Sequence, residues 1–258
     1  MKITVTLLLL LSTCLEVLAV KPGGCGCTNC ENNANQRQKV SGAQNETAPF
    51  NAIAHLYRTK AVLGTAVLGT VSFVNNTFLL GSAHYIKAPK LIKSLTLERY
   101  NAAGEITRLV LAKGEFTIIP NKQHRRLRND ATVIAVKDPA KLRKFFGSTF
   151  SLQDYSQLKP AAESEAHVTG YPCDMGGSLV EKHCSVADLK PTTDGQVIGY
   201  PVCTCKGDSG APLWIEKDGK YYLIGIHHGG GENDPDLKHL NAASLISGNL
   251  LQWILDPY

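Results

Sequence analysis

The chain has 258 residues, of which 43% are hydrophobic, 19% charged and 7% aromatic. This composition supports a sizeable buried core and excludes disorder as the main state. The 27 basic and 22 acidic residues leave a net charge of +5, which is too small to predict a nucleic-acid surface, so we expect no nucleic-acid partner.

An apolar stretch over residues 3–15 opens the chain, preceded by Lys2 and followed by small residues up to Ala19. This arrangement is typical of a secretory signal peptide, here residues 1–19. A transmembrane helix is the weaker alternative, because Glu16 interrupts a run shorter than the roughly 20 apolar residues that cross a bilayer. No later segment is long and apolar enough to span, so we expect a secreted, extracellular protein with no membrane partner.

Residues 20–39 differ from the rest of the chain because they are rich in Gly, Asn and Gln and have almost no apolar side chains. Such a segment has no core of its own. It carries Cys25, Cys27 and Cys30, whose spacing suits a zinc site as well as disulfides. In an exported segment thiols form disulfides more often than metal sites, so we predict no metal ion.

Export also affects residues beyond this segment. Asn-x-Thr sequons begin at Asn45 and Asn75 and are candidate glycosylation sites. Removal of the signal peptide leaves seven cysteines, and this odd number predicts one free thiol or a link to a partner chain. The four cysteines after residue 39 allow three pairings among themselves, and they are Cys173, Cys184, Cys203 and Cys205.

From Val40 onward, short apolar runs alternate with Gly, Pro and Asn, which indicates mostly antiparallel β structure. A helical period occurs only in residues 244–255, where five large apolar residues can share one face. The 219 residues after residue 39 therefore suit an all-β protein of two sheets or two barrels. The strand-like runs lie at 50–57, 67–74, 77–80, 95–100, 106–111, 116–119, 132–136, 167–171, 197–200, 212–215 and 221–226.

The first chemical motif is Ser209 within the run Gly-Asp-Ser-Gly-Ala-Pro. On a tight turn, the backbone N–H groups of Gly207 and Ser209 can converge on an oxyanion and stabilise a tetrahedral intermediate. A base and an acid occur earlier in the chain. His84 follows an apolar run that ends in small residues, and Asp130 stands at the head of another run.

These motifs resemble those of the chymotrypsin-like serine peptidases, whose base lies in a Thr-Ala-Ala-His-Cys-like segment and whose nucleophile lies in Gly-Asp-Ser-Gly-Gly-Pro. This chain has Ser-Ala-His-Tyr, then Asn-Asp-Ala-Thr-Val, then Gly-Asp-Ser-Gly-Ala-Pro. Tyr85 stands where many relatives have a cysteine. The resemblance extends over residues 40–258 and implies two packed antiparallel six-stranded β-barrels with a C-terminal α-helix. The implied parts are a first barrel at 40–145, a second at 146–243 and a helix at 244–255.

The resemblance also implies a mechanism and a class of partner. Ser209 attacks a peptide carbonyl, His84 takes its proton, and Asp130 holds the imidazole ring and stabilises its cation. The expected protein is a monomeric serine endopeptidase that needs no cofactor and takes a peptide or protein substrate. The alternative is a non-catalytic homologue that acts as a secreted binding or regulatory module. Such homologues usually lose a residue of the catalytic triad, and all three are present here.

Activation by cleavage is a further implication of the resemblance. Another peptidase would cut after Lys39, and the new amine of Val40 would pair with Asp208 beside the nucleophile. A buried charge pair can set the geometry of the oxyanion loop, so the uncut precursor would be nearly inactive. Residues 20–39 are then a propeptide, and the alternative is a flexible tail on an enzyme that needs no cutting.

Substrate preference is predicted from the residues near the nucleophile. Cys203 stands where trypsin-like enzymes have an aspartate, so cleavage after Lys or Arg is not expected. Thr204 and His227 resemble the glutamyl endopeptidase branch, and both can donate hydrogen bonds to a carboxylate while Lys206 adds positive potential. We therefore expect a preference for Glu or Asp before the scissile bond. The expected pocket residues are Cys203, Thr204, Lys206, His227, Gly229 and Gly230.

Overall fold

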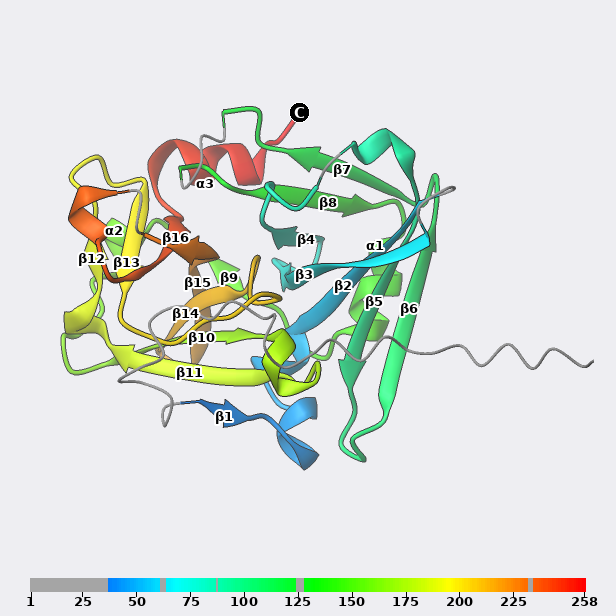
Figure 1. Ribbon diagram of the computed structural model, residues 1–258, viewed down its shortest axis with the longest axis horizontal. Helices are drawn as coiled ribbons and strands as arrows, with labels where there is room; N and C mark the ends of the chain where they lie inside the picture. Colours follow the sequence, from blue (N-terminus) through cyan, green and yellow to red (C-terminus); the bar gives the residue numbers. More distant parts are fainter. Residues whose placement is uncertain (1–36, 61–63, 87, 124–127, 232–233) are drawn as a thin grey trace, which may run out of the picture.

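The computed structural model describes residues 37–60, 64–86, 88–123, 128–231 and 234–258. The predicted signal peptide and most of the predicted propeptide, with its three cysteines, lie outside the described residues. The described chain consists mainly of antiparallel strands in two curled sheets that lie side by side (Figure 1). The expected all-β, two-barrel architecture with a C-terminal helix is confirmed.

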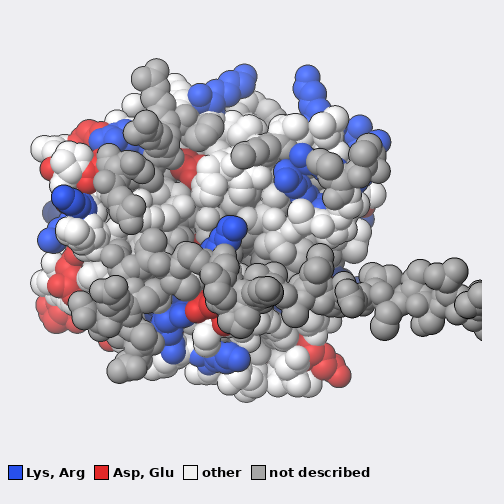
Figure 2. All heavy atoms as spheres, in the orientation of Figure 1, with Lys and Arg blue, Asp and Glu red and all other residues white. Residues whose placement is uncertain are grey.

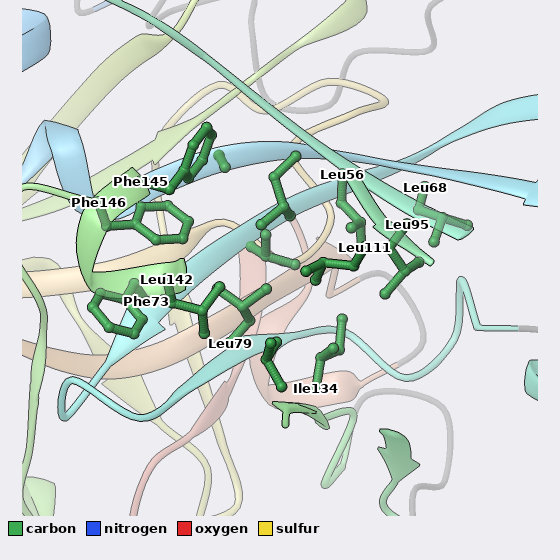
Figure 3. Close-up of a cluster of buried hydrophobic side chains, with 14 of the residues drawn as sticks. Leu56, Leu68, Phe73, Leu79, Leu95, Leu111, Ile134, Leu142, Phe145 and Phe146 are labelled. Atoms are coloured by element: carbon green, nitrogen blue, oxygen red, sulfur yellow. The ribbon is translucent and has the colours of Figure 1, made fainter. Parts of the chain in front are cut away.

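The first sheet has seven strands in the order β6-β5-β2-β3-β4-β8-β7. Its inward positions follow the alternation expected of strands, as in β5, where Leu95 and Leu97 are buried; an irregularity in the pairing of β5 with β2 places Ile92 inward as well. These side chains join a core that the helix after β8 closes with Phe145 and Phe146 (Figure 3). The strands are β2 (Ile53–Lys60), β3 (Gly64–Val74), β4 (Phe78–Gly81), β5 (Ile92–Tyr100), β6 (Ile106–Ala112), β7 (Phe116–Pro120) and β8 (Thr132–Val136).

The second sheet has nine strands, eight of them in the order β1-β11-β10-β14-β15-β16-β13-β12, with β9 paired in parallel to β15. The residues just before Val40 form its edge strand, since Gln38 pairs with Glu181 and Lys39 with Val180. The strands are β1 (Gln38–Lys39), β9 (Ser151–Leu152), β10 (Glu165–Gly170), β11 (Val180–Ser185), β12 (Lys190–Pro191), β13 (Val197–Tyr200), β14 (Pro212–Lys217), β15 (Lys220–Gly230) and β16 (Asn241–Leu245).

The described helices are short. The C-terminal helix α3 begins at Gly248 and not at 244, because Ser244 and Leu245 complete strand β16. Apolar spacing alone could not separate the buried end of this strand from the buried face of the helix. The helices are α1 (Pro139–Phe145), α2 (Tyr155–Leu158) and α3 (Gly248–Leu255), with 3₁₀ turns η3 (Gly42–Glu46), η4 (Phe50–Ala52), η5 (Pro89–Leu91), η6 (Cys173–Met175), η7 (Val186–Asp188) and η8 (Pro235–Leu237).

A shared core joins the two sheets. Ile53 and Val133 of the first sheet pack in one cluster with Trp214 and Ile226 of the second. Helix α3 extends this cluster through Ile254 and lies beside β7 of the first sheet (Figure 1). No helix in the described ranges is long and apolar enough to cross a membrane. On the face shown in Figure 2, basic and acidic side chains are interspersed.

The described cysteines are in two states. Cys173, Cys203 and Cys205 are disulfide-bonded, whereas Cys184 on β11 is a buried free thiol. A free Cys184 excludes all three pairings of these four cysteines among themselves and agrees with the free thiol that the odd number of cysteines predicts. Burial raises the pKa of the Cys184 thiol to about 12, so the thiol is protonated at neutral pH and is a poor nucleophile.

Candidate active site

The three residues of the predicted triad lie together where the two sheets meet. His84 follows β4 and Asp130 precedes β8, and these strands pair with Gly81 opposite Thr132. His84 Nδ1 lies 2.6 Å from Asp130 Oδ2, and the backbone N–H of His84 donates to Asp130 Oδ1 at 2.8 Å. Ser209 comes from the second sheet, just before β14, and its Oγ lies 3.2 Å from His84 Nε2. The arrangement links a hydroxyl, an imidazole and a carboxylate in one hydrogen-bonded chain.

Asp130 is enclosed by protein. Its side chain is 0% exposed, and its backbone N–H donates to Ser244 Oγ at 2.8 Å. Burial opposes ionisation of the carboxyl, but the hydrogen bond with His84 and the positive charges that His84 and His228 can carry outweigh it and lower the pKa of Asp130. An ionised Asp130 accepts a hydrogen bond from the Nδ1–H group, so the proton of the neutral ring stays on Nδ1 and Nε2 of His84 is the basic nitrogen facing Ser209.

The loop before Ser209 is shaped by a glycine and clamped from the first sheet. Gly207 has φ +98°, and a Cβ at this position would lie 2.3 Å from the carbonyl oxygen of Tyr171, so only glycine fits. Thr70 Oγ1 donates to the Gly207 carbonyl at 3.0 Å, and the Thr70 N–H donates to the Ser209 carbonyl at 2.8 Å. No described backbone carbonyl accepts a hydrogen bond from the N–H group of Gly207 or of Ser209. Both are therefore available to an oxyanion.

Asp208 has a partner that the sequence reasoning missed. Its Oδ2 lies 2.5 Å from Nζ of Lys182, and both side chains are 0% exposed. Val40, the partner expected after cleavage, donates its N–H to the Leu179 carbonyl at 3.0 Å in this uncut chain, and Lys39 is exposed. The signal for Lys182 was present in the sequence. It occupies an inward position of β11 between apolar residues, where a lysine needs a buried counter-ion.

The expected pocket residues are in three different environments. Cys203, Thr204 and His227 are buried, Gly229 and Gly230 are half-buried on β15, and Lys206 is exposed. The sequence reasoning did not foresee Tyr200, whose hydroxyl lies 2.5 Å from His227 Nδ1.

Burial holds the pKa of His227 well below its ordinary value, and the positive charges that the nearby His228 and Lys182 can carry act in the same direction. The ring of His227 is therefore neutral, and Lys206 brings the positive charge of this set.

The two sequons differ in exposure. Asn45 is buried in η3, and its Nδ2 donates to the Asn101 carbonyl at 3.3 Å. A glycan on Asn45 requires this bond to break. Asn75 lies exposed in the turn between β3 and β4. Among the residues placed by the structure, no group of three or more His, Cys, Asp or Glu side chains is arranged to hold a metal ion.

A family model described as Trypsin matches residues 39–254, which include His84, Asp130, Ser209 and all strands of both sheets except the first residue of β1. No curated protein matches the chain.

Proposed function

Because the chain belongs to the trypsin family of chymotrypsin-like serine peptidases, we propose that it hydrolyses peptide bonds through Ser209, His84 and Asp130. One observation carries the proposal. His84 lies between Asp130 and Ser209 with a hydrogen-bond distance on each side, 2.6 Å and 3.2 Å. This is the geometry in which an imidazole can take the proton of a serine hydroxyl while a carboxylate stabilises the resulting cation.

The reaction proceeds by acyl transfer. Ser209 Oγ attacks the substrate carbonyl as its proton passes to His84 Nε2, and the N–H groups of Gly207 and Ser209 stabilise the oxyanion. His84 then gives the proton to the leaving amine, and an acyl-enzyme remains. Water attacks this ester with His84 again acting as base, which releases the second product and restores Ser209. Asp130 stays ionised throughout and keeps the ring in the required tautomer.

Secretion and processing belong to the same proposal. The N-terminal sequence supports export, and the exposed Lys39 supports cleavage by another peptidase after this residue. Among the sequons, the exposure of Asn75 supports a glycan there. N-terminal sequencing of the secreted protein tests the cleavage site, and a chain that begins elsewhere than Val40 contradicts it.

A preference for Glu or Asp before the scissile bond completes the proposal. Cys203 supplies no negative charge to the pocket, and the exposed Lys206 favours an acidic substrate side chain. His227 contributes as a neutral ring that is already bonded to Tyr200. A peptide library measures the preference as the ratio of cleavage after Glu to cleavage after Lys or Leu. A ratio of one refutes the preference. His227→Ala tests the role of His227, with the exposed His239→Ala as control, and an unchanged ratio in His227→Ala refutes that role.

A fluorophosphonate probe, which reacts only with an activated serine, tests the catalytic proposal. We expect the secreted protein to be labelled and Ser209→Ala to remain unlabelled. The matched measurement is the far-ultraviolet circular dichroism of both proteins, which should agree. A folded wild-type chain that is never labelled and cleaves no peptide contradicts the proposal and identifies a non-catalytic homologue.

A further inference from the structure

Lys182 is a fully buried lysine whose ammonium contacts the carboxylate next to the nucleophile. Strand β11 alternates inward and outward positions, with Val180, Lys182 and Cys184 buried. Burying an ammonium is costly unless a counter-ion accompanies it. The counter-ion is Asp208, at 2.5 Å from Nζ. Burial lowers the pKa of Lys182, and the charge of Asp208 opposes that shift.

The ion pair is attached directly to the oxyanion loop. The same Asp208 oxygen that contacts Lys182 also accepts the backbone N–H of Cys205 at 2.9 Å. The other oxygen, Oδ1, is buried against Gly170, where an added Cβ would lie 2.6 Å from it, and no described group donates a hydrogen bond to it. The carboxylate is therefore held through Oδ2 and enclosed at Oδ1. Its position sets that of the neighbouring Gly207 and Ser209.

Residues 37–39 contact the second sheet in the chain whose bond after Lys39 is intact. Strand β1 pairs with β11, the strand that carries Lys182. Arg37 adds a two-pronged ion pair with Asp174, at 2.7 and 2.8 Å. The hydrogen-bonded chain from Asp130 to Ser209 and the clamp from Thr70 are formed in this same uncut chain. An assembled site thus coexists with an uncleaved N-terminal segment.

Resting on the proposed function, we propose that Lys182 supplies the positive charge that holds Asp208 and the oxyanion loop, so that the chain is catalytically competent without cleavage after Lys39. Lys182 is then a positioning residue that acts through Asp208. This replaces the expectation of a nearly inactive precursor. Cleavage after Lys39 trims the enzyme and does not switch it on.

The experiment compares uncut and cut forms of the full secreted protein. Lys39→Gln removes the cleavage site, and Lys182→Met is placed in the same background. Exposed Lys190→Met serves as the matched control. The rate of fluorophosphonate labelling and the kcat and KM for a peptide are measured, together with thermal unfolding. Lys39→Gln is expected to be labelled at a rate close to that of the chain beginning at Val40.

Lys182→Met in the uncut background is expected to be labelled about 10²- to 10³-fold more slowly, because the oxyanion donors lose their alignment. The loss should appear in kcat with KM little changed, which general destabilisation does not produce. If Lys182→Met does not fold, Lys182→Met with Asp208→Asn removes both buried charges, and the same loss of kcat is expected.

Three outcomes overturn the inference. The first is an inert Lys39→Gln protein beside a reactive chain that begins at Val40. The second is a folded Lys182→Met protein that is labelled as fast as its background, and the third is the same result for the double variant. If neither the uncut nor the cut protein is labelled, the proposed function itself fails, so the two failures are distinguishable.

Discussion

The substitution Thr70→Val tests whether the first sheet holds the oxyanion loop of the second. Thr70 is fully buried on β3. Its hydroxyl donates to the Gly207 carbonyl at 3.0 Å and accepts the backbone N–H of Tyr171 at 3.2 Å. Valine keeps the shape of threonine but leaves both backbone groups without this partner. Each buried group that loses its hydrogen bond costs about 1–3 kcal/mol, so the expected loss of stability for the two groups is about 2–6 kcal/mol.

Thr132→Val is the matched control. Thr132 is also fully buried, on β8, but its hydroxyl has no hydrogen-bond partner among the described groups. Replacing it with valine should leave stability unchanged or raise it. The stability of both variants is measured by urea unfolding in a Ser209→Ala background, which prevents self-digestion. An unchanged m-value shows that a shift in the unfolding midpoint reports a change in stability. Equal stabilities of Thr70→Val and Thr132→Val would refute the clamp.

Three further predictions concern charge, thiol reactivity and glycosylation. Asp130→Asn should lower kcat by about 10⁴-fold, because the ring of His84 loses its orienting carboxylate. The pKa of Asp130 is lowered from 3.8, so the stability it contributes is present above that value and lost as pH falls through the lower, folded pKa; acid unfolding curves should therefore be shallower in Asp130→Asn. Cys184, with a raised pKa and a buried position, should resist iodoacetamide in the folded protein and react once the protein is unfolded in urea, as mass spectrometry would record. In a eukaryotic secretion host, peptide mapping should find a glycan on Asn75 and none on Asn45. A glycan on Asn45 would contradict this prediction and show that the sugar is attached before the hydrogen bond from Asn45 to the Asn101 carbonyl forms.

The sequence predicted the three residues of the site because each lies in a short motif at the end of a strand. His84 and Asp130 flank paired strands, and Ser209 lies on a turn that requires glycine. Their convergence depends on how the two sheets pack. Strand-like runs in one sequence do not specify this packing, and the resemblance to a known family supplied it.

The partners of these residues could not be predicted in the same way. Thr70 and Tyr200 carry no motif, and they contact the site across 137 and 27 positions of the chain. The charge of His227 also depended on burial, which spacing does not reveal. A neutral, fully enclosed ring follows from packing against neighbours that lie far apart in the sequence.

For Lys182, the sequence contained part of the answer. An alternation of buried and exposed positions along β11 places a lysine inward, and elementary electrostatics then demands an acid nearby. The sequence could therefore have predicted that Lys182 has a buried partner. It could not have identified Asp208 as that partner, because the choice among the acidic residues depends on how the loop before β14 packs against strands β10 and β11.

The segment from residue 31 to residue 172 contains no cysteine, and it forms the whole first sheet with two of the three residues of the site. Beside His84, the place that many relatives fill with a bridge is occupied by Tyr85, whose ring packs on Gly69 and whose hydroxyl donates to the Thr70 carbonyl at 3.1 Å. The first sheet contains no thiol to oxidise, so thiol reagents and the redox state of the medium act on cysteines outside it, in the second sheet and in the segment before residue 31. During synthesis, the residues that carry the base and the acid can adopt their structure before the disulfide chemistry of the later cysteines begins.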